Sequence, residues 1–72
     1  MAELTDRQLT GKIRSTRAVM IRSKAALSNA IERYRGRTTV QTVRTLADMA
    51  ARYKLVCEEL ERLLAEFSRR GL

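Results

Sequence analysis

The sequence predicts an all-α fold, an antiparallel helical hairpin whose two helices pack in the manner of a coiled coil. Three observations support this prediction. The 72 residues include no Pro and only three Gly, whereas Ala, Leu, Glu, Arg and Lys, which favour helix, are abundant. Apolar residues recur alternately every three and four residues, which is the spacing of a coiled-coil seam. The one strong break lies in the stretch YRGRTT, so we expect a single domain over residues 1–72.

The first helix is predicted over residues 6–35. Thr5 followed three residues later by Gln8 is typical of a capping box, in which each side chain accepts a hydrogen bond from the other residue's backbone N–H. Gly11 lowers the helix propensity of the first turns by about 1 kcal/mol relative to Ala. At a rise of 1.5 Å per residue, a helix of this length spans about 45 Å.

A short turn is predicted over residues 36–38, because Gly36 suits the left-handed conformation that follows a helix end. Thr38 followed by Gln41 has the capping-box signature, which predicts a second helix over residues 39–70. Two helices joined by so short a turn lie antiparallel, and we expect residues whose numbers sum to about 73 to face each other.

Both predicted helices carry a seven-residue apolar repeat made of two series of residues. In the first helix the series are Ile13, Met20, Leu27 and Tyr34, and Thr16, Ser23 and Ala30, with Leu9 before them. In the second helix the series are Leu46, Tyr53, Leu60 and Phe67, and Val43, Ala50, Cys57 and Leu64. We predict that these series form the seam, with large residues facing large ones and small residues facing small ones.

A third apolar stripe on the second helix predicts self-association. Met49, Val56 and Leu63 repeat at intervals of seven and widen the apolar face to roughly 140°, more than one partner helix covers. We therefore expect a homodimer that forms an antiparallel four-helix bundle, with docking on the helices of another protein as the alternative. The predicted interface residues are Met49, Val56, Leu63, Leu60, Cys57 and Phe67.

Positive charge is concentrated in the first half of the chain. The net charge is +7, and the segment from Arg7 to Ile31 contains no acidic residue. On a helical wheel one flank of the first helix collects most of these cations. The flank consists of Arg7, Arg14, Arg17, Lys24 and Arg35. A basic flank of this length can follow a phosphate backbone, so we predict contact with RNA or another polyanion.

Two other uses of these cations remain open. They can serve solubility or steer the approach of a partner protein. They can also form ion pairs with acidic residues of a neighbouring subunit. The acidic residues available for such pairs are Glu58, Glu59, Glu61 and Glu66.

No residue pattern indicates catalysis or cofactor binding. The chain has no His, so Ser side chains and the single Cys57 have no neighbouring base, and no cluster offers metal-ligand spacing. We therefore predict a non-enzymatic protein with no cofactor, metal or small-molecule substrate. A lone cysteine fits a reducing compartment, and no apolar run reaches the roughly 18 residues of a membrane span. We expect an intracellular, cytoplasmic protein without integral membrane association.

The order of these elements resembles a known helical hairpin. A basic helix containing KIRSTR and SKAALSNAIERY is followed by a short turn and by TVRTLADMAARYKLVCEELERLL. This succession is similar to the N-terminal helical hairpin of Gag polyproteins from BEL/Pao-type LTR retrotransposons, which implies an assembly module close to RNA or a membrane. The architecture is also similar to dimeric hairpin four-helix bundles such as the plasmid regulator ROP, which grip RNA through basic side chains on one face.

Overall fold

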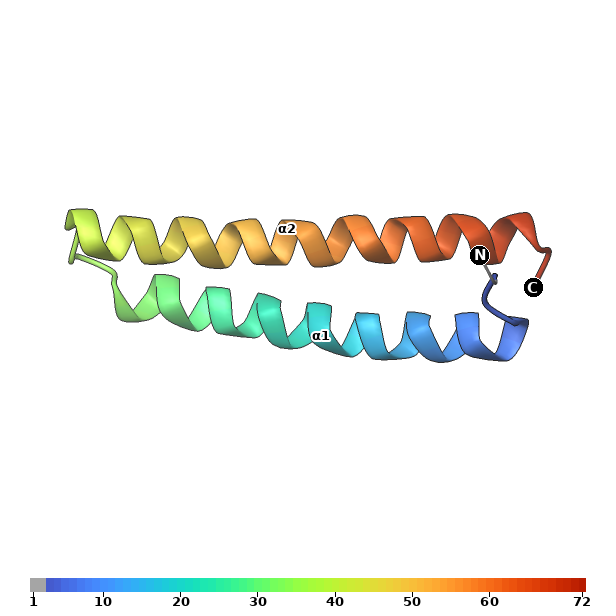
Figure 1. Cartoon of the computed structure of the whole chain (residues 1–72). Helices are drawn as coiled ribbons and strands as arrows, with labels where there is room; N and C mark the ends of the chain where they lie inside the picture. The colour runs from blue at the N-terminus through green and yellow to red at the C-terminus, as the bar shows by residue number, and fades with distance from the viewer. Residues whose placement is uncertain (1–2) are drawn as a thin grey trace.

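Two long helices make up the fold. The computed structural model describes residues 3–72, with α1 at Asp6–Arg33 and α2 at Val40–Arg69. The helices lie side by side and antiparallel, and both ends of the chain are at the same end of the molecule (Figure 1). The molecule is elongated and measures 47 × 20 × 16 Å along its principal axes. The predicted all-α antiparallel hairpin is therefore confirmed.

The N-terminal cap of α1 is the predicted capping box. The backbone N–H of Gln8 donates to Thr5 Oγ1 at 3.1 Å, and the backbone N–H of Thr5 donates to Gln8 Oε1 at 2.9 Å. The helix ends at Arg33, two residues earlier than predicted, and Tyr34 forms its C-terminal cap. Because the Tyr34 N–H donates to the carbonyl of Ala30 at 2.9 Å, the chain leaves α1 with its last hydrogen bonds made.

The turn between the helices contains Gly36 in the left-handed conformation, with φ of +81°, as predicted. The capping box of α2 lies one residue later than the sequence pattern predicts. Its N-cap is Thr39, whose Oγ1 accepts from the Thr42 N–H at 3.2 Å, while the Thr39 N–H donates to Thr42 Oγ1 at 3.0 Å. The Thr42 hydroxyl also donates to the carbonyl of Arg37 at 2.6 Å, which ties the start of α2 to the turn.

The seam of α1 is the predicted one. Every residue within α1 that is not exposed belongs to the predicted series, and their spacing alternates between four and three residues. These residues are Leu9, Ile13, Thr16, Met20, Ser23, Leu27 and Ala30. The series therefore marks the one face of α1 that α2 covers.

The seam of α2 differs from the prediction in one of its two series. Leu46, Tyr53, Leu60 and Phe67 are covered as expected, but the second series consists of Met49, Val56 and Leu63. The prediction that Met49, Val56 and Leu63 lie on the outside of the hairpin is therefore wrong. Val43, Ala50 and Leu64 are exposed instead, and Cys57 is half-buried at the border of the seam.

Side-chain volume explains this difference. Val56 lines one groove together with Thr16, and Met49 lines another together with Ser23. The larger residues of α2 thus lie beside the small residues of α1 and fill the space that those leave. Close packing favours this arrangement over small residues facing small ones, which would leave voids unless the helices moved together. The expected matching of small with small is therefore wrong.

The core that results is small. Within residues 3–72 the buried apolar residues are Leu9, Leu60 and Leu63, and Thr16 is the buried polar one. Two helices expose most of their circumference, so the remaining seam residues keep part of their surface in contact with water. A core of this size supplies only a few kcal/mol of stability.

Replacing Gly36 with Ala is expected to lower the free energy of unfolding by about 1 kcal/mol, because a Cβ is strained at φ of +81°. Gly11→Ala is the matched control. It lies inside α1, where an added Cβ meets no atom within 4 Å, and it should raise the free energy of unfolding by about 1 kcal/mol. Urea denaturation followed by circular dichroism measures both, and effects of the same sign would contradict this account of the turn.

Candidate interaction face

One apolar stripe of α2 is left uncovered by α1. It consists of Val43, Ala50, Cys57 and Leu64, and we call it the outer stripe. Val43 is 52% exposed and Leu64 is 46% exposed, whereas neighbouring Leu63 in the seam is 9% exposed. The outer stripe therefore runs beside the seam along nearly the whole of α2.

Cations of α1 lie on the same side of the molecule as the outer stripe. A surface hollow between the helices is lined by Thr10, Ile13, Arg14, Arg17, Leu64 and Phe67. Lys24 follows Arg17 after seven residues and Ile31 follows Lys24 after seven more, so both continue this side of α1. Apolar and cationic side chains thus share one side of the hairpin.

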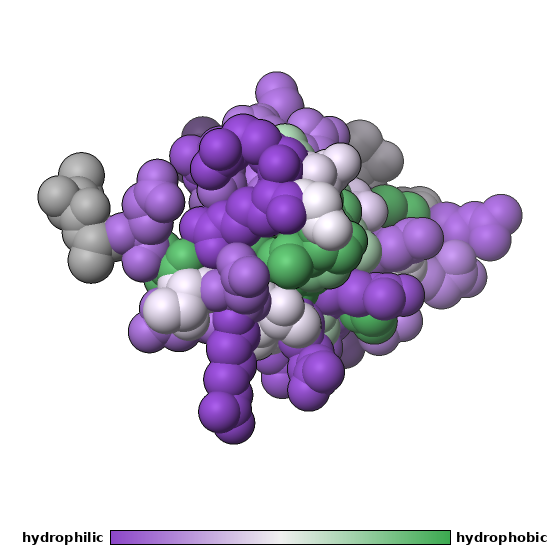
Figure 2. Space-filling model, turned by 90° about the vertical axis from the view of Figure 1, so that its right-hand side faces the viewer, coloured by the Kyte–Doolittle hydropathy of each residue, from purple (hydrophilic) through white to green (hydrophobic). Residues whose placement is uncertain are grey.

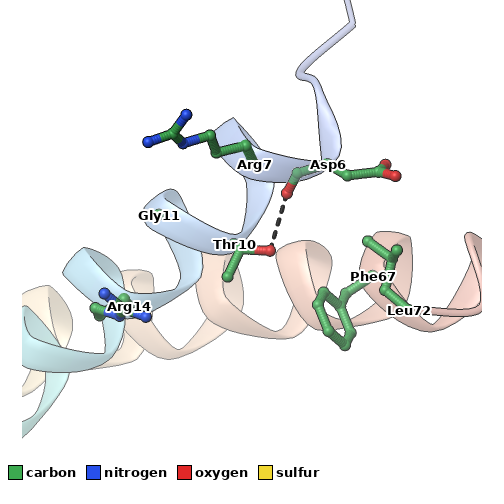
Figure 3. A pocket seen from close by; sticks show the side chains of 7 residues that line it. All are labelled: Asp6, Arg7, Thr10, Gly11, Arg14, Phe67 and Leu72. Carbon is green, nitrogen blue, oxygen red and sulfur yellow. Dashed lines mark hydrogen bonds between the residues drawn. The ribbon is translucent and has the colours of Figure 1, made fainter.

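A second hollow extends this side to the open end of the hairpin (Figure 3). It shares Thr10, Arg14 and Phe67 with the first hollow and adds Arg7 and Leu72. The Thr10 hydroxyl donates to the backbone carbonyl of Asp6 at 2.9 Å, and the Arg7 guanidinium points away from Phe67. Figure 2 views the molecule from this end and shows hydrophobic residues at the surface, framed by hydrophilic ones.

We call this side of the molecule the mixed face. Its apolar part is the outer stripe together with Ile21 and Ile31, which are 55% and 53% exposed. Its cations on α1 are Arg7, Arg14, Arg17 and Lys24, and Lys54 of α2 lies at its edge. The opposite side is less apolar, since its exposed large hydrophobic residues are Val19 and Leu55.

The predicted polyanion-binding residues divide into two groups. Arg7, Arg14, Arg17 and Lys24 lie on the mixed face, and none of them belongs to an ion pair within residues 3–72. Arg35 lies beyond the end of α1, where its guanidinium is 3.6 Å from the carboxylate of Glu32. The first four therefore form the cationic part of the candidate site.

The predicted oligomer-interface residues lie mainly in the seam. Leu60 and Leu63 are already buried by α1 within one chain, so they offer little surface to a second chain. Cys57 borders the mixed face, and Phe67 lines both of its hollows. Met49, Val56 and Leu63, which were predicted as an outer stripe, thus lie in the hairpin's own seam, and Leu60 lies in the seam as predicted.

Sequence reasoning assigned Val43, Ala50 and Leu64 to the seam and so missed them as outer residues. Apolar periodicity alone does not separate the outer stripe from the series of Met49, Val56 and Leu63. One series lies three residues before the large residues such as Leu46, and the other lies three residues after them. The usable signal is volume, since Met, Val and Leu fill space beside small α1 residues better than Ala and Cys.

Ion pairs gather at the open end of the hairpin. The Arg70 guanidinium donates to Asp6 Oδ1 at 3.0 Å and to Glu66 Oε1 at 2.9 Å, which joins the end of α2 to the start of α1. Arg69 also pairs with Glu66. Hydrogen bonds from Arg69, and then from Arg70, lower the pKa of Glu66 to about 2.

No group of three or more His, Cys, Asp or Glu side chains within residues 3–72 is placed to hold a metal ion. The pKa of Tyr53 is raised above its ordinary value, mainly by a hydrogen bond with the neighbouring Cys57 side chain. Neither helix in this part of the chain combines the length and the apolar character needed to cross a membrane.

Comparisons with known proteins give no match. No protein-family model matches the chain, and no match is found among curated proteins or solved structures. The mixed face is therefore interpreted from its own residues.

The low pKa of Glu66 predicts a pH dependence of stability. The unfolded chain binds the Glu66 proton near the ordinary value of 4.5, and the folded chain binds it only near 2. The stabilisation is therefore complete above about pH 5 and is lost as the pH falls toward 2. Thermal unfolding should show a melting temperature that falls over this range, and Glu66→Gln should flatten the fall. Asp48→Asn, which removes an exposed acid outside the ion pairs of residues 3–72, should leave it unchanged; equal profiles for all three proteins would contradict the assignment.

Proposed function

We propose that the protein is a non-enzymatic self-association module, in which two hairpins join through their mixed faces into an antiparallel four-helix bundle. The observation that carries this proposal is the exposed surface. The chain exposes 5996 Å², whereas a compact monomer of 8.2 kDa exposes about 4,500 Å². The excess of about 1,500 Å² is larger than the roughly 800 Å² that each partner contributes to a standard interface.

The mixed face is the side best suited to the second hairpin. Its exposed apolar residues lie on both helices, so a second copy that covers it would remove Ile21, Ile31, Val43 and Leu64 from water. Burial of apolar surface stabilises by about 25 cal/mol per Å². This contribution would add to a core in which only three apolar residues within residues 3–72 are buried in the single hairpin.

A second candidate function is contact with RNA or another polyanion. It is favoured by the four cations of the mixed face, which have no acidic partner within residues 3–72. The resemblance to the Gag hairpin stays a prediction and agrees with a module that combines assembly with RNA contact. Because the cations and the outer stripe share one face, a polyanion and a second hairpin would compete for it.

Light scattering at micromolar concentration tests self-association directly. The wild-type chain should have the mass of a dimer, and Leu64→Lys should be a helical monomer, because it places a further positive charge in the outer stripe beside Arg14 and Arg17. Leu55→Lys is the matched control, since Leu55 is 65% exposed on the opposite side and its replacement should leave the dimer intact. A wild-type chain that is a folded monomer would overturn the proposal and would favour docking of the outer stripe on the helices of another protein.

Binding to single-stranded RNA at two salt concentrations tests polyanion contact. If the four cations of the mixed face neutralise four phosphates, affinity should fall by about 50-fold between 50 and 200 mM salt. Arg14→Gln combined with Arg17→Gln should halve the slope of log K against log salt concentration. Arg62→Gln is the control, because Arg62 pairs with Glu59 on the opposite side. Binding that does not depend on salt would contradict this second candidate function.

A further inference from the structure

We infer that the two hairpins of the dimer lie with their turns at the same end, so that α1 of each subunit packs on α2 of its partner. This inference rests on the proposed self-association and specifies its symmetry. The two-fold axis would run parallel to the long axis of the hairpin. The alternative axis runs across the hairpin, places the turns at opposite ends and packs α1 on α1.

The first argument is that the two halves of the mixed face differ in charge. The α1 half carries Arg7, Arg14, Arg17 and Lys24, and the segment from Arg7 to Ile31 has no acid to balance them. On α2, Glu61 lies one helical turn before Leu64, at the edge of the outer stripe, and Glu58 lies one turn earlier, farther round the helix. Packing α1 on α1 would therefore bring cations against cations, whereas packing α1 on α2 brings cations toward carboxylates.

The second argument is that the opposite charges lie at the same level along the hairpin. Arg14 and Leu64 line one hollow, so they lie close together along the hairpin. Glu61 is three residues from Leu64, which is about 4.5 Å along α2. A two-fold axis parallel to the helices preserves these levels, and so it brings Arg14 opposite the partner subunit's Glu61, with Arg17 about one helical turn away. Neither Arg14, Arg17 nor Glu61 has an ion-pair partner within residues 3–72.

The third argument is that side-chain sizes match in this arrangement. Thr10 and Leu64 line the same hollow, and seven-residue steps from each give the other levels of the face. These steps place Arg17 opposite Cys57 of the partner subunit and Lys24 opposite Ala50 of the partner subunit. A long aliphatic stem can lie over a small residue while its charged head reaches the edge of the interface. The last level pairs exposed Ile31 with exposed Val43 of the partner subunit, which buries apolar surface near the turns.

One residue of the face opposes this arrangement. Lys54 lies seven residues before Glu61 and so faces the level between Arg17 and Lys24 of the partner subunit. Its ammonium group would be close to like charges there. Lys54→Glu is therefore expected to strengthen dimerisation about tenfold, whereas it would have no such effect on a dimer that packs α1 on α1.

Distance measurement between the two turns tests the inference. Thr38→Cys in a Cys57→Ser background carries one spin label per chain at an exposed turn position, and pulsed electron paramagnetic resonance gives the distance between the labels in the dimer. Turns at the same end should give distances near the hairpin width of 20 Å, and turns at opposite ends should give distances near its length of 47 Å. The mass of the labelled sample is measured in parallel.

Charge exchange provides a test that does not depend on labels. Arg14→Glu with Arg17→Glu gives a chain whose mixed face is acidic on both helices at this level, and Glu58→Lys with Glu61→Lys gives a chain that is basic on both. Each variant alone should lose dimer affinity at least tenfold, and an equimolar mixture should recover a heterodimer, because every contact is then matched.

The outcomes separate the two proposals. A wild-type monomer overturns self-association, and the inference falls with it. A dimer whose turns lie about 47 Å apart, or a mixture that forms no heterodimer, overturns the inference alone. Short turn-to-turn distances together with the recovered heterodimer support both.

Discussion

The structure depends on a limit on what two helices can cover. Each helix of a hairpin faces its partner along one stripe, formed by residues that alternate at three and four positions. α1 has one such stripe and buries it. On α2 the large residues, beginning with Leu46, can form a stripe either with the series that begins at Met49 or with the series that begins at Val43. The hairpin can cover only one of these two series. The outer stripe of Val43, Ala50, Cys57 and Leu64 is therefore a consequence of the packing of Met49, Val56 and Leu63 in the seam.

Contacts at the two ends of the hairpin set how the helices align. At one end Gly36 and the pair Thr39 and Thr42 set the turn and the start of α2. At the other end Arg70 joins Asp6 of α1 to Glu66 of α2. These contacts fix the antiparallel register at both ends, although exposed ion pairs contribute little to stability. Strength in the middle of the hairpin must come from packing, and there the apolar residues are only partly covered.

The fold could be predicted from local patterns, but the candidate site could not be placed fully. The Thr5–Gln8 capping box, the left-handed Gly36 and the seam of α1 each depend on residues close in sequence. Which series of α2 enters the seam depends on which side chains fill the space beside Thr16 and Ser23. That can be decided only once the two helices are packed together. Arg7, Arg14, Arg17 and Lys24 lie on one flank of α1, which follows from helical spacing alone, whereas Arg35 lies beyond the end of the helix. Their position beside the outer stripe emerges only when α2 is in place.

Cations and apolar side chains lie together on the mixed face, and this combination limits the kind of surface that can cover it. Cations that served solubility alone would be expected on the side away from the seam, interspersed with acids, as Arg62 and Glu59 are. Arg14 and Arg17 instead border the hollow that contains Leu64 and Phe67. Covering that hollow requires a surface that offers apolar side chains and carboxylates at the same level. In the proposed dimer α2 of a second copy offers both, whereas α1 of a second copy offers apolar side chains and cations but no carboxylate between Arg7 and Ile31. In that proposal the charge therefore determines which helix can cover the face.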